Sequence, residues 1–411
     1  MKLRCYTLLL YSLLQLHFYK LHAQPQVLFP PDETQIEIPF EMHGNFMVLP
    51  VVFQRIFPLR FIYDTGAENS ILLKKEISDL LGVVYEREIT VYGSDMSIAL
   101  GAQIARKVFL DLPNIKMVKD MLILNEDFFR FDENAGVEIH GILGSETFKG
   151  HVVKINYARQ IITVYAKNSF KPPLKSEYDS VPIKMIRNKP YVEVDLTLQN
   201  DSIVPVKLLL DTGASLSMLL YSGTAKGLTI PANALKGSIG RGLGGNLEGH
   251  IGRVKKMKLG SFPLTNVISR FQTLPIDVDT TQIVGRNGII GAEIMARFNL
   301  IFDYTHQIMY LQPNNQYKNE FIYDRSGLTL VAGGRNLSEF TVQGVLPNTP
   351  AALADIRIGD KLVKIGIWNT KLLHLTQLTR KFQGKVGKEM KLTILRDGQK
   401  LKKKFKLQEL I

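Results

Sequence analysis

The sequence predicts an all-β protein that consists of two similar lobes and a smaller third unit. One series of segments occurs twice, short strand-like segments alternate with turns rich in Gly, Asn and Asp, and the pattern changes after Tyr323. A chain of 411 residues is too long for a single hydrophobic core, while an apolar fraction of 45% and a charged fraction of 22% are ordinary for folded protein. We therefore expect several compact domains.

The N-terminus has the pattern of a secretory signal. Two cations precede an apolar run from Cys5 to Leu16, and a small residue follows at Ala23. This pattern predicts a signal peptide over residues 1–23, export to the periplasm or out of the cell, and no transmembrane span after its removal. A membrane anchor is the alternative, although the apolar run is shorter than the roughly 20 residues that cross a bilayer. Loss of Cys5, the only cysteine, would exclude disulfides and cysteine chemistry.

An internal repeat with a constant offset of 147 residues defines the two lobes. Three pairs of segments share this offset: "PLRFIYDTGAENS" from Pro58 with "PVKLLLDTGASLS" from Pro205, "HGILGSETF" from His140 with "NGIIGAEIM" from Asn287, and "VVKINYARQIITVY" from Val152 with "NLIFDYTHQIMYL" from Asn299. A duplicated lobe explains them best. We place the N-terminal lobe at 24–172 and the C-terminal lobe at 173–319, with a proline-containing link between them.

Most of each copy is expected to form short strands. The clearest patterns lie at 45–53, 107–112 and 117–124 in the first copy and at 191–198, 206–211 and 299–304 in the second. One helix is expected over 72–82, because Leu and Ile recur there at helical spacing before Gly82.

The third unit, 320–411, has no counterpart in the repeat. Strand-like segments and one or two short helices are expected, and "LRDGQKL" predicts a hairpin with Asp-Gly at its turn. The basic segment "KLKKKFKL" alternates in the manner of an edge strand with solvated lysines.

The repeat duplicates an Asp-Thr-Gly turn at the end of an apolar strand. A local two-fold axis between the lobes would bring Asp64 and Asp211 together. Two adjacent carboxylates share one proton, because both cannot ionise cheaply. The ionised acid can then take a proton from water while the protonated acid donates to a carbonyl oxygen, without metal, cofactor or covalent intermediate.

The paired Asp-Thr-Gly-Ala turns, each followed by a Gly-Ile-Leu-Gly or Gly-Ile-Ile-Gly strand, resemble the aspartic proteases, specifically retropepsin-like lobes fused into a pepsin-like single chain. The resemblance covers about Ile36 to Gln312. It implies bilobal β-barrels with pseudo-two-fold symmetry, a peptide or protein substrate, and a monomer. It implies catalysis by Asp64 and Asp211, supported in the catalytic loops by Thr65, Gly66, Thr212 and Gly213.

The same resemblance implies a β-hairpin flap over the substrate. "TVYGSDMSIALGAQI" from Thr90 and the glycine-rich "SIGRGLGGNLEGHIG" from Ser238 occupy the expected places, and the second is the better candidate. An ordinary loop and a phosphate-binding loop are the alternatives. The expected flap residues are Tyr92, Gly93, Gly240, Gly242, Gly244 and Gly245.

Alanine follows each catalytic-loop glycine, at Ala67 and Ala214, where pepsin-type sites usually carry Ser or Thr. Loss of that hydroxyl donor should raise the pKa values of the two aspartates. Activity is therefore expected at mildly acidic to neutral pH.

The segment from about Phe321 to Leu410 resembles a PDZ domain, a small β-barrel with one or two helices. The family's carboxylate-binding loop would be Gly327, Leu328, Thr329 and Leu330, with Thr329 in a place where the family has Gly. The resemblance implies that this unit binds a C-terminal peptide. A scaffolding domain without ligand is the alternative.

Other site types find less support in the sequence. The net charge is +13, but basic residues are spread along the chain, which favours solvated faces over a nucleic-acid or anionic-surface patch. The histidines show no metal-ligand spacing, and no His-Glu-x-x-His or Gly-x-Ser-x-Gly motif is present. We therefore expect an exported aspartic endopeptidase whose PDZ domain recruits substrates or regulates, with a catalytically silent peptide-binding protein as the rival hypothesis.

Overall fold

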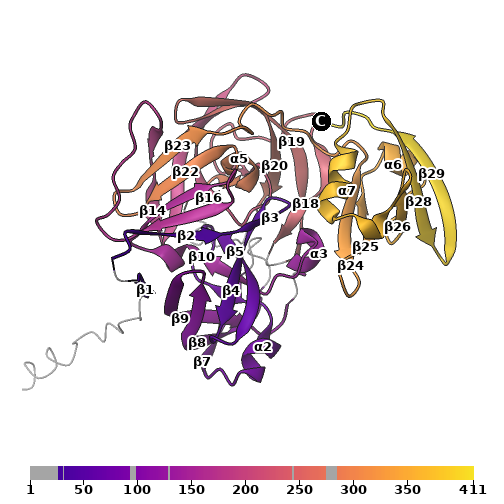
Figure 1. The fold of residues 1–411 in the computed structure, drawn as a ribbon. Coiled ribbons are helices and arrows are strands. Elements are labelled where there is room, and N and C mark those ends of the chain that lie inside the picture. Colours follow the sequence, from indigo (N-terminus) through magenta and orange to yellow (C-terminus); the bar gives the residue numbers. More distant parts are fainter. Residues whose placement is uncertain (1–25, 31, 93–98, 128–129, 243–244, 275–284) are drawn as a thin grey trace, which may run out of the picture.

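The computed structural model describes residues 26–411 except positions 31, 93–98, 128–129, 243–244 and 275–284. Four sheets make up most of the described part of the chain, and the few helices are short (Figure 1). The expected all-β fold with two similar lobes is confirmed.

The first lobe is built on a nine-stranded sheet with the order β1-β9-β6-β10-β5-β4-β8-β7 and β3 paired to β4. Its strands are β1 (Gln26–Leu28), β3 (Glu41–His43), β4 (Phe46–Phe53), β5 (Phe57–Asp64), β6 (Ile71–Leu72), β7 (Tyr85–Tyr92), β8 (Ala99–Leu112), β9 (Ile115–Leu124) and β10 (Gly141–Gly144). Its helices are α2 (Lys75–Leu80), α3 (Phe131–Ala135) and the 3-10 helix η1 (Ser145–Phe148). Helix α2 stops before Gly82, whose φ of 65° is the left-handed conformation that glycine adopts readily.

The second lobe repeats this architecture in an eight-stranded sheet with the order β14-β15-β16-β21-β17-β20-β19-β18. Its strands are β14 (Lys184–Ile186), β15 (Lys189–Thr197), β16 (Ile203–Asp211), β17 (Met218–Ser222), β18 (Leu235–Gly242), β19 (Gly245–Leu259), β20 (Phe262–Thr273) and β21 (Gly288–Gly291). Helix α5 (Ala292–Met295) follows β21 directly, as η1 follows β10.

The two copies share one local topology around the aspartates. In the first lobe β5 pairs in parallel with β10, so that Asp64 lies opposite Gly144. In the second lobe β16 pairs in parallel with β21, and Asp211 lies opposite Gly291. The repeat in the sequence therefore becomes a repeat of strand pairing and register.

A third sheet joins the lobes and displays their symmetry. Its strand order is β13-β23-β22-β11-β12-β2, with two strands on each side of the central β11–β22 pair. The strands are β2 (Gln35–Pro39), β11 (Val152–Asn156), β12 (Ile161–Tyr165), β13 (Asp179–Pro182), β22 (Phe298–Asp303) and β23 (Ile308–Pro313). One buried apolar cluster runs through both lobes, so they form one continuous core.

The third unit has its own sheet and its own apolar core. The sheet order is β24-β25-β26-β28-β29, with β27 paired to β26; the elements are β24 (Leu328–Gly333), β25 (Glu339–Val345), α6 (Pro350–Leu353), β26 (Lys361–Ile365), β27 (Trp368–Asn369), the 3-10 helix η2 (Thr370–Leu372), α7 (Leu375–Phe382), β28 (Glu389–Arg396) and β29 (Gln399–Lys406). The predicted hairpin is confirmed: Asp397 and Gly398 both have positive φ between β28 and β29. β29 is an edge strand with mostly exposed lysines.

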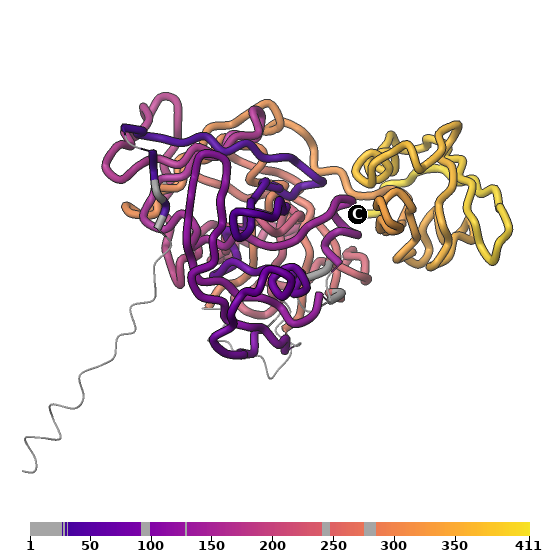
Figure 2. Tube along the Cα trace, turned by 60° about the horizontal axis from the view of Figure 1, so that its bottom comes forward, coloured from indigo at the N-terminus to yellow at the C-terminus, as the bar shows by residue number. Residues whose placement is uncertain are grey.

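The third unit protrudes from one end of the two-lobed body (Figure 2). Arg253 of β19 ties it to the second lobe by donating hydrogen bonds to the carbonyl oxygens of Phe321 (3.1 Å) and Ile411 (3.3 Å). On the side of the first lobe, α3 lies beside β24, and Gly44 N–H donates to Thr376 Oγ1 on α7 over 3.1 Å. The unit therefore contacts both lobes.

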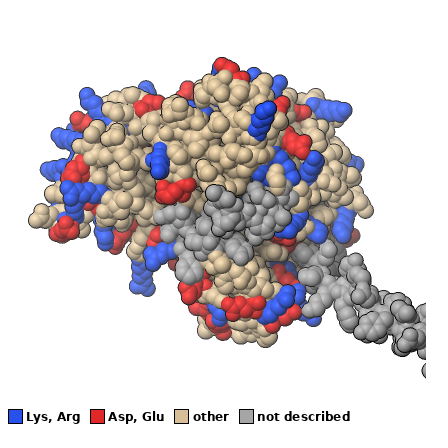
Figure 3. Space-filling model, turned by 180° about the vertical axis from the view of Figure 1, so that it is seen from behind, with Lys and Arg blue, Asp and Glu red and all other residues tan. Residues whose placement is uncertain are grey.

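On the face opposite to the view of Figure 1, lysines and arginines are mixed with acidic residues (Figure 3). Within the described part of the chain, we find no helix with the length and apolar character needed to cross a membrane.

Candidate active site

Two tight loops at the ends of β5 and β16 hold the aspartates. Asp64 Oδ1 accepts hydrogen bonds from the backbone N–H groups of Gly66 (2.7 Å) and Ala67 (3.1 Å). Asp211 Oδ1 accepts the equivalent bonds from Gly213 and Ala214, both at 2.9 Å. Each loop thus orients its own carboxylate through backbone donors, which is the arrangement that the Asp-Thr-Gly turns predict.

The two loops interlock through their threonines, which are fully buried. Thr65 Oγ1 donates to the Leu210 carbonyl (2.7 Å) and accepts from Thr212 N–H (3.0 Å). Thr212 Oγ1 donates to the Tyr63 carbonyl (2.8 Å) and accepts from Thr65 N–H (3.0 Å). These four reciprocal bonds fix the two catalytic loops against each other about the pseudo-two-fold axis.

The loop glycines leave room for the carboxylate of the opposite lobe. A Cβ atom on Gly66 would overlap the carboxyl group of Asp211, and one on Gly213 would overlap that of Asp64. Side chains at these two positions would push the aspartates apart, so the glycines are needed for the close approach.

The aspartates form one coupled pair, and their side chains are hydrogen-bonded to each other. Burial raises the pKa of Asp64 well above its usual value, and the Asp211 carboxylate raises it further. Burial also raises the pKa of Asp211, but the hydrogen bond from Asp64 and the charge of Arg286 oppose the increase. Burial and the proximity of the two carboxyl groups therefore favour a shared proton.

A buried network behind the first loop was not predicted from the sequence. Lys119 forms a buried ion pair with Glu146, and Ser70 N–H donates to the same carboxylate over 2.8 Å. Ser145 Oγ donates to the carbonyl of Ala67 over 2.9 Å. These bonds brace the loop that carries Asp64.

The second lobe has a simpler version of this network, in which Ser217 Oγ donates to Glu293 over 2.7 Å. Because Ser217 and Glu293 lie 147 residues after Ser70 and Glu146, the repeat alignment contained a signal for both pairs. The position equivalent to Lys119 is Asn266, so no repeat signal pointed to the lysine.

A turn of the first lobe reaches the catalytic loop of the second. Asn45 Nδ2 donates to the Ser215 carbonyl over 2.7 Å, one residue beyond Ala214. The neighbouring residue Gly44 is the one that contacts Thr376 of the third unit. The turn between β3 and β4 therefore connects the third unit with the loop that carries Asp211.

The predicted flap is described in part. Gly93 and Gly244 lie outside the described residues, whereas Tyr92 ends β7 and Gly245 begins β19. Gly240 and Gly242 lie in β18, which pairs with β19 as one arm of a long hairpin. Gly240 has a φ of 150°, and the strand register shifts between Ser238 and Gly240. The hairpin geometry is compatible with a flap, and the flap role stays a prediction.

The predicted carboxylate-binding loop of the third unit contacts an internal carboxylate. Asp324 Oδ1 accepts hydrogen bonds from the N–H groups of Gly327 (2.6 Å) and Leu328 (3.3 Å). Thr329 and Leu330 continue into β24, with a register shift between them. Two backbone N–H donors of this loop are therefore already hydrogen-bonded to a side chain of the same protein.

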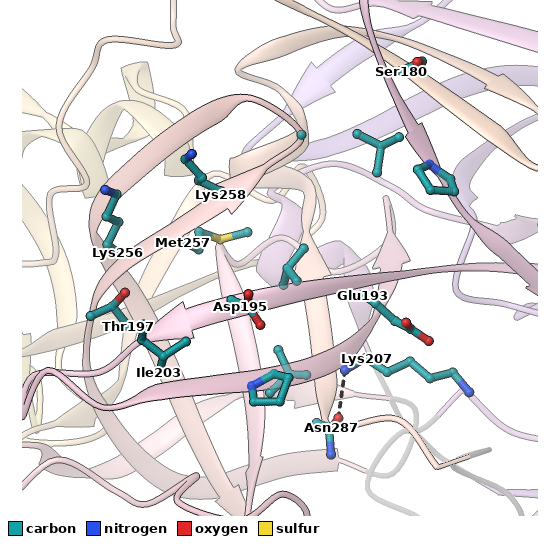
Figure 4. Close-up of a pocket in the computed structure, with 16 residues that line it drawn as sticks. Ser180, Glu193, Asp195, Thr197, Ile203, Lys207, Lys256, Met257, Lys258 and Asn287 are labelled. Atoms are coloured by element: carbon teal, nitrogen blue, oxygen red, sulfur yellow. Dashed lines mark hydrogen bonds between the residues drawn. The ribbon is translucent and has the colours of Figure 1, made fainter.

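A broad hollow of about 860 Å³ lies on another part of the second lobe (Figure 4). Its lining includes Glu193, Asp195, Lys256 and Lys258, and neither catalytic aspartate borders it. Within the described ranges, no three His, Cys, Asp or Glu side chains are grouped to hold a metal ion.

A family model described as aspartyl protease matches residues 194–294. The matched segment includes Asp211, Thr212, Gly213 and all of β21, which are the residues that build the second catalytic loop and its supporting strand. A search of curated proteins found no match. The family match therefore supports a protease-like function through the second lobe.

Proposed function

We propose that the chain is a single-chain aspartic endopeptidase that hydrolyses peptide bonds with Asp64 and Asp211. The observation that carries the proposal is the coupled pair of carboxylates at the centre of two interlocked loops. The aspartyl-protease match over the second lobe supports the same reaction class.

In the proposed reaction, a water molecule attacks the carbonyl carbon of the scissile bond. The ionised aspartate takes a proton from that water, and the protonated aspartate donates its proton to the carbonyl oxygen, which yields a tetrahedral diol. The aspartate that took the proton of the water then donates it to the amide nitrogen, while the other aspartate takes a proton from a hydroxyl group of the diol. The C–N bond breaks, a carboxylic acid and an amine leave, and the pair again holds one shared proton. Each step uses only the two carboxyl groups and water.

The unequal surroundings of the two acids suggest their roles in the free enzyme. Because Arg286 opposes the rise in the pKa of Asp211, we assign the proton to Asp64 and the negative charge to Asp211. Asp211 is then the general base for the attacking water and Asp64 the general acid.

The third unit, which resembles a PDZ domain, is proposed to regulate the active site. Its internal Asp324 contact supports this role over capture of a peptide C-terminus, and the Gly44–Thr376 and Asn45–Ser215 bonds supply a physical connection. Export of the mature chain after removal of residues 1–23 remains part of the proposal, based on the N-terminal pattern.

The direct test is cleavage of a peptide library by the purified mature chain. Asp64→Asn and Asp211→Asn should each lower kcat at least about 1000-fold, because either variant removes the acid–base pair. Asp397→Asn, in the exposed turn between β28 and β29 of the third unit, is a control with the same change of side chain. Peptide binding without cleavage by the wild type would instead support the catalytically silent rival.

The pH dependence gives a second test of the proposal. Raised pKa values of the coupled pair, with burial as the main cause, predict a bell-shaped profile with its maximum between mildly acidic and neutral pH. A maximum below about pH 3, where unperturbed carboxylates become protonated, would contradict the proposed electrostatics.

A further inference from the structure

Two cations of the second lobe, the buried Arg286 and the half-buried Lys189, have no acidic ion-pair partner among the residues that the structure describes. Lys189 begins β15, and Arg286 lies two residues before β21. Arg286 is only 6% exposed, and within the described ranges neither residue forms an ion pair with a carboxylate. Because an unpaired buried charge is costly, this arrangement is expected where a ligand supplies the missing charge.

The surroundings of Arg286 contain unused hydrogen-bonding groups. Its Nη2 donates to Tyr221 Oη over 3.1 Å, and its guanidinium carbon lies 5.7 Å from the centre of the Tyr221 ring. Its Nε has no hydrogen-bond partner among the described residues, and neither does the hydroxyl of Tyr191. Tyr191 lies close enough for Arg286 to oppose the increase in pKa that burial causes in the tyrosine. Two neighbouring polar groups are thus available to one ligand.

This cluster lies in the sheet that carries Asp211, because Tyr191 of β15 is opposite Leu209 of β16 and Arg286 leads into β21, which pairs with β16. Arg286 is close enough to affect the pKa of Asp211, as described above. Burial lowers the pKa of Lys189 and the charge of Arg286 lowers it further, against the influence of Glu68, Asp211 and Asp64. Glu68 follows Ala67 in the first catalytic loop, so the charge of Lys189 is within electrostatic range of groups in both lobes.

We infer that Lys189, Tyr191, Tyr221 and Arg286 form a cationic subsite that binds the carboxylate of an Asp or Glu side chain of the substrate. This inference rests on the proposed peptidase function. The Nε group and a neighbouring Nη group of the guanidinium match the two oxygens of a carboxylate, and Tyr191 Oη adds a donor. Lys189, which is less buried than Arg286, supplies a second charge.

The subsite exists on one side of the catalytic pair only. The residue of the first lobe equivalent to Arg286 is Ile139, a fully buried apolar side chain. The residue equivalent to Lys189 is Met42. An acidic residue is therefore preferred at a single position of the substrate, on one side of the cleaved bond.

The test maps the cleavage sites of the full mature chain in a peptide library and then compares matched peptides with Glu or Gln at the mapped position. The wild type should show a kcat/KM about 10- to 100-fold higher for Glu, the size of a charge-assisted hydrogen bond. Arg286→Met and Lys189→Met should each reduce this ratio, while Arg286→Lys should retain part of it. Arg335→Met, on an exposed loop of the third unit, removes the same charge and should leave the ratio unchanged.

Three outcomes would overturn the inference while leaving the peptidase function intact. The first is cleavage without a preference for Glu over Gln at any position. The second is an equal loss of activity on both peptides in the Arg286 and Lys189 variants. That result would mean that the two cations act on the aspartates and do not bind a side chain of the substrate. The third is a preference that appears with a free peptide C-terminus and vanishes with a C-terminal amide, because the ligand would then be the terminal carboxylate.

A binding measurement separates this inference from the peptidase function. Immobilised Asp64→Asn protein, which retains Asp211 and the subsite, is incubated with the same library, and bound peptides are identified by mass spectrometry. Enrichment of Glu and Asp that disappears in the Asp64→Asn/Arg286→Met double variant supports the subsite, even if the wild type cleaves nothing. Circular dichroism of each variant confirms that the fold is retained.

Discussion

The interlocked threonines allow a quantitative prediction for Thr65→Val. The substitution keeps the shape of the side chain but removes the hydroxyl, which is fully buried and makes two hydrogen bonds. Thr212 N–H would lose its acceptor, at a cost of about 1–3 kcal/mol for a buried unsatisfied donor, and the bond to the Leu210 carbonyl would cost a further 0.5–1.5 kcal/mol or so. The free energy of unfolding should therefore fall by about 2–4 kcal/mol.

Urea unfolding followed by far-UV circular dichroism measures this change. Trp368, the only tryptophan, lies in the third unit, so its fluorescence reports that unit separately and should shift little. Thr163→Val is the matched control, because Thr163 is a buried strand residue whose side chain makes no hydrogen bond to any described residue. Thr212→Val should match Thr65→Val, since its two bonds are the symmetric counterparts. A loss for Thr65→Val no larger than that of the control would refute the reasoning.

Three further predictions address the loops, the shared proton and the third unit. Gly213→Ala should lower kcat at least about 100-fold, since the new methyl group overlaps the Asp64 carboxyl group, whereas Gly333→Ala, with open space around it, should not. Asp64→Asn should stabilise the protein at pH 7.5 but not near pH 4 in urea titrations. In the wild type, the folded state binds the Asp64 proton more tightly than the unfolded chain does. This tighter proton binding stabilises the fold fully below about pH 3.9, and the stabilisation is lost as the pH rises through the raised pKa of Asp64. Arg253→Met should accelerate proteolysis between the second lobe and the third unit, compared with Lys255→Met on the same strand; equal rates would contradict the docking role of Arg253.

The repeat made much of the site predictable. Asp64, Asp211 and their flanking threonines and glycines share one offset, and two equivalent loops about an axis must meet at that axis. The strand patterns and the Gly82 helix stop were equally readable, because alternating burial and left-handed glycine leave local signals. The strand and helix-end patterns therefore predicted the fold class, and the repeat predicted the candidate catalytic pair.

Features without a symmetric counterpart could not be predicted in this way. Lys189 and Arg286 have apolar equivalents in the first lobe, and only the folded chain brings them close to Asp211. Lys119 likewise reaches Glu146 through strand pairing rather than through a sequence pattern. The Asp324 contact was not predicted. The loop that begins at Gly327 was compared with the PDZ pattern, in which the accepting carboxylate belongs to a bound peptide.

The mismatch between Ile139 and Arg286 has a consequence for substrate polarity. A site made of two identical subunits offers the same environment to a polypeptide entering in either direction. Here a single gene encodes both halves, so mutation can alter one without the other. A peptide bound from amino to carboxyl end would meet a different order of side chains from one bound in reverse, so under the proposed function the two ends of the substrate are distinguished.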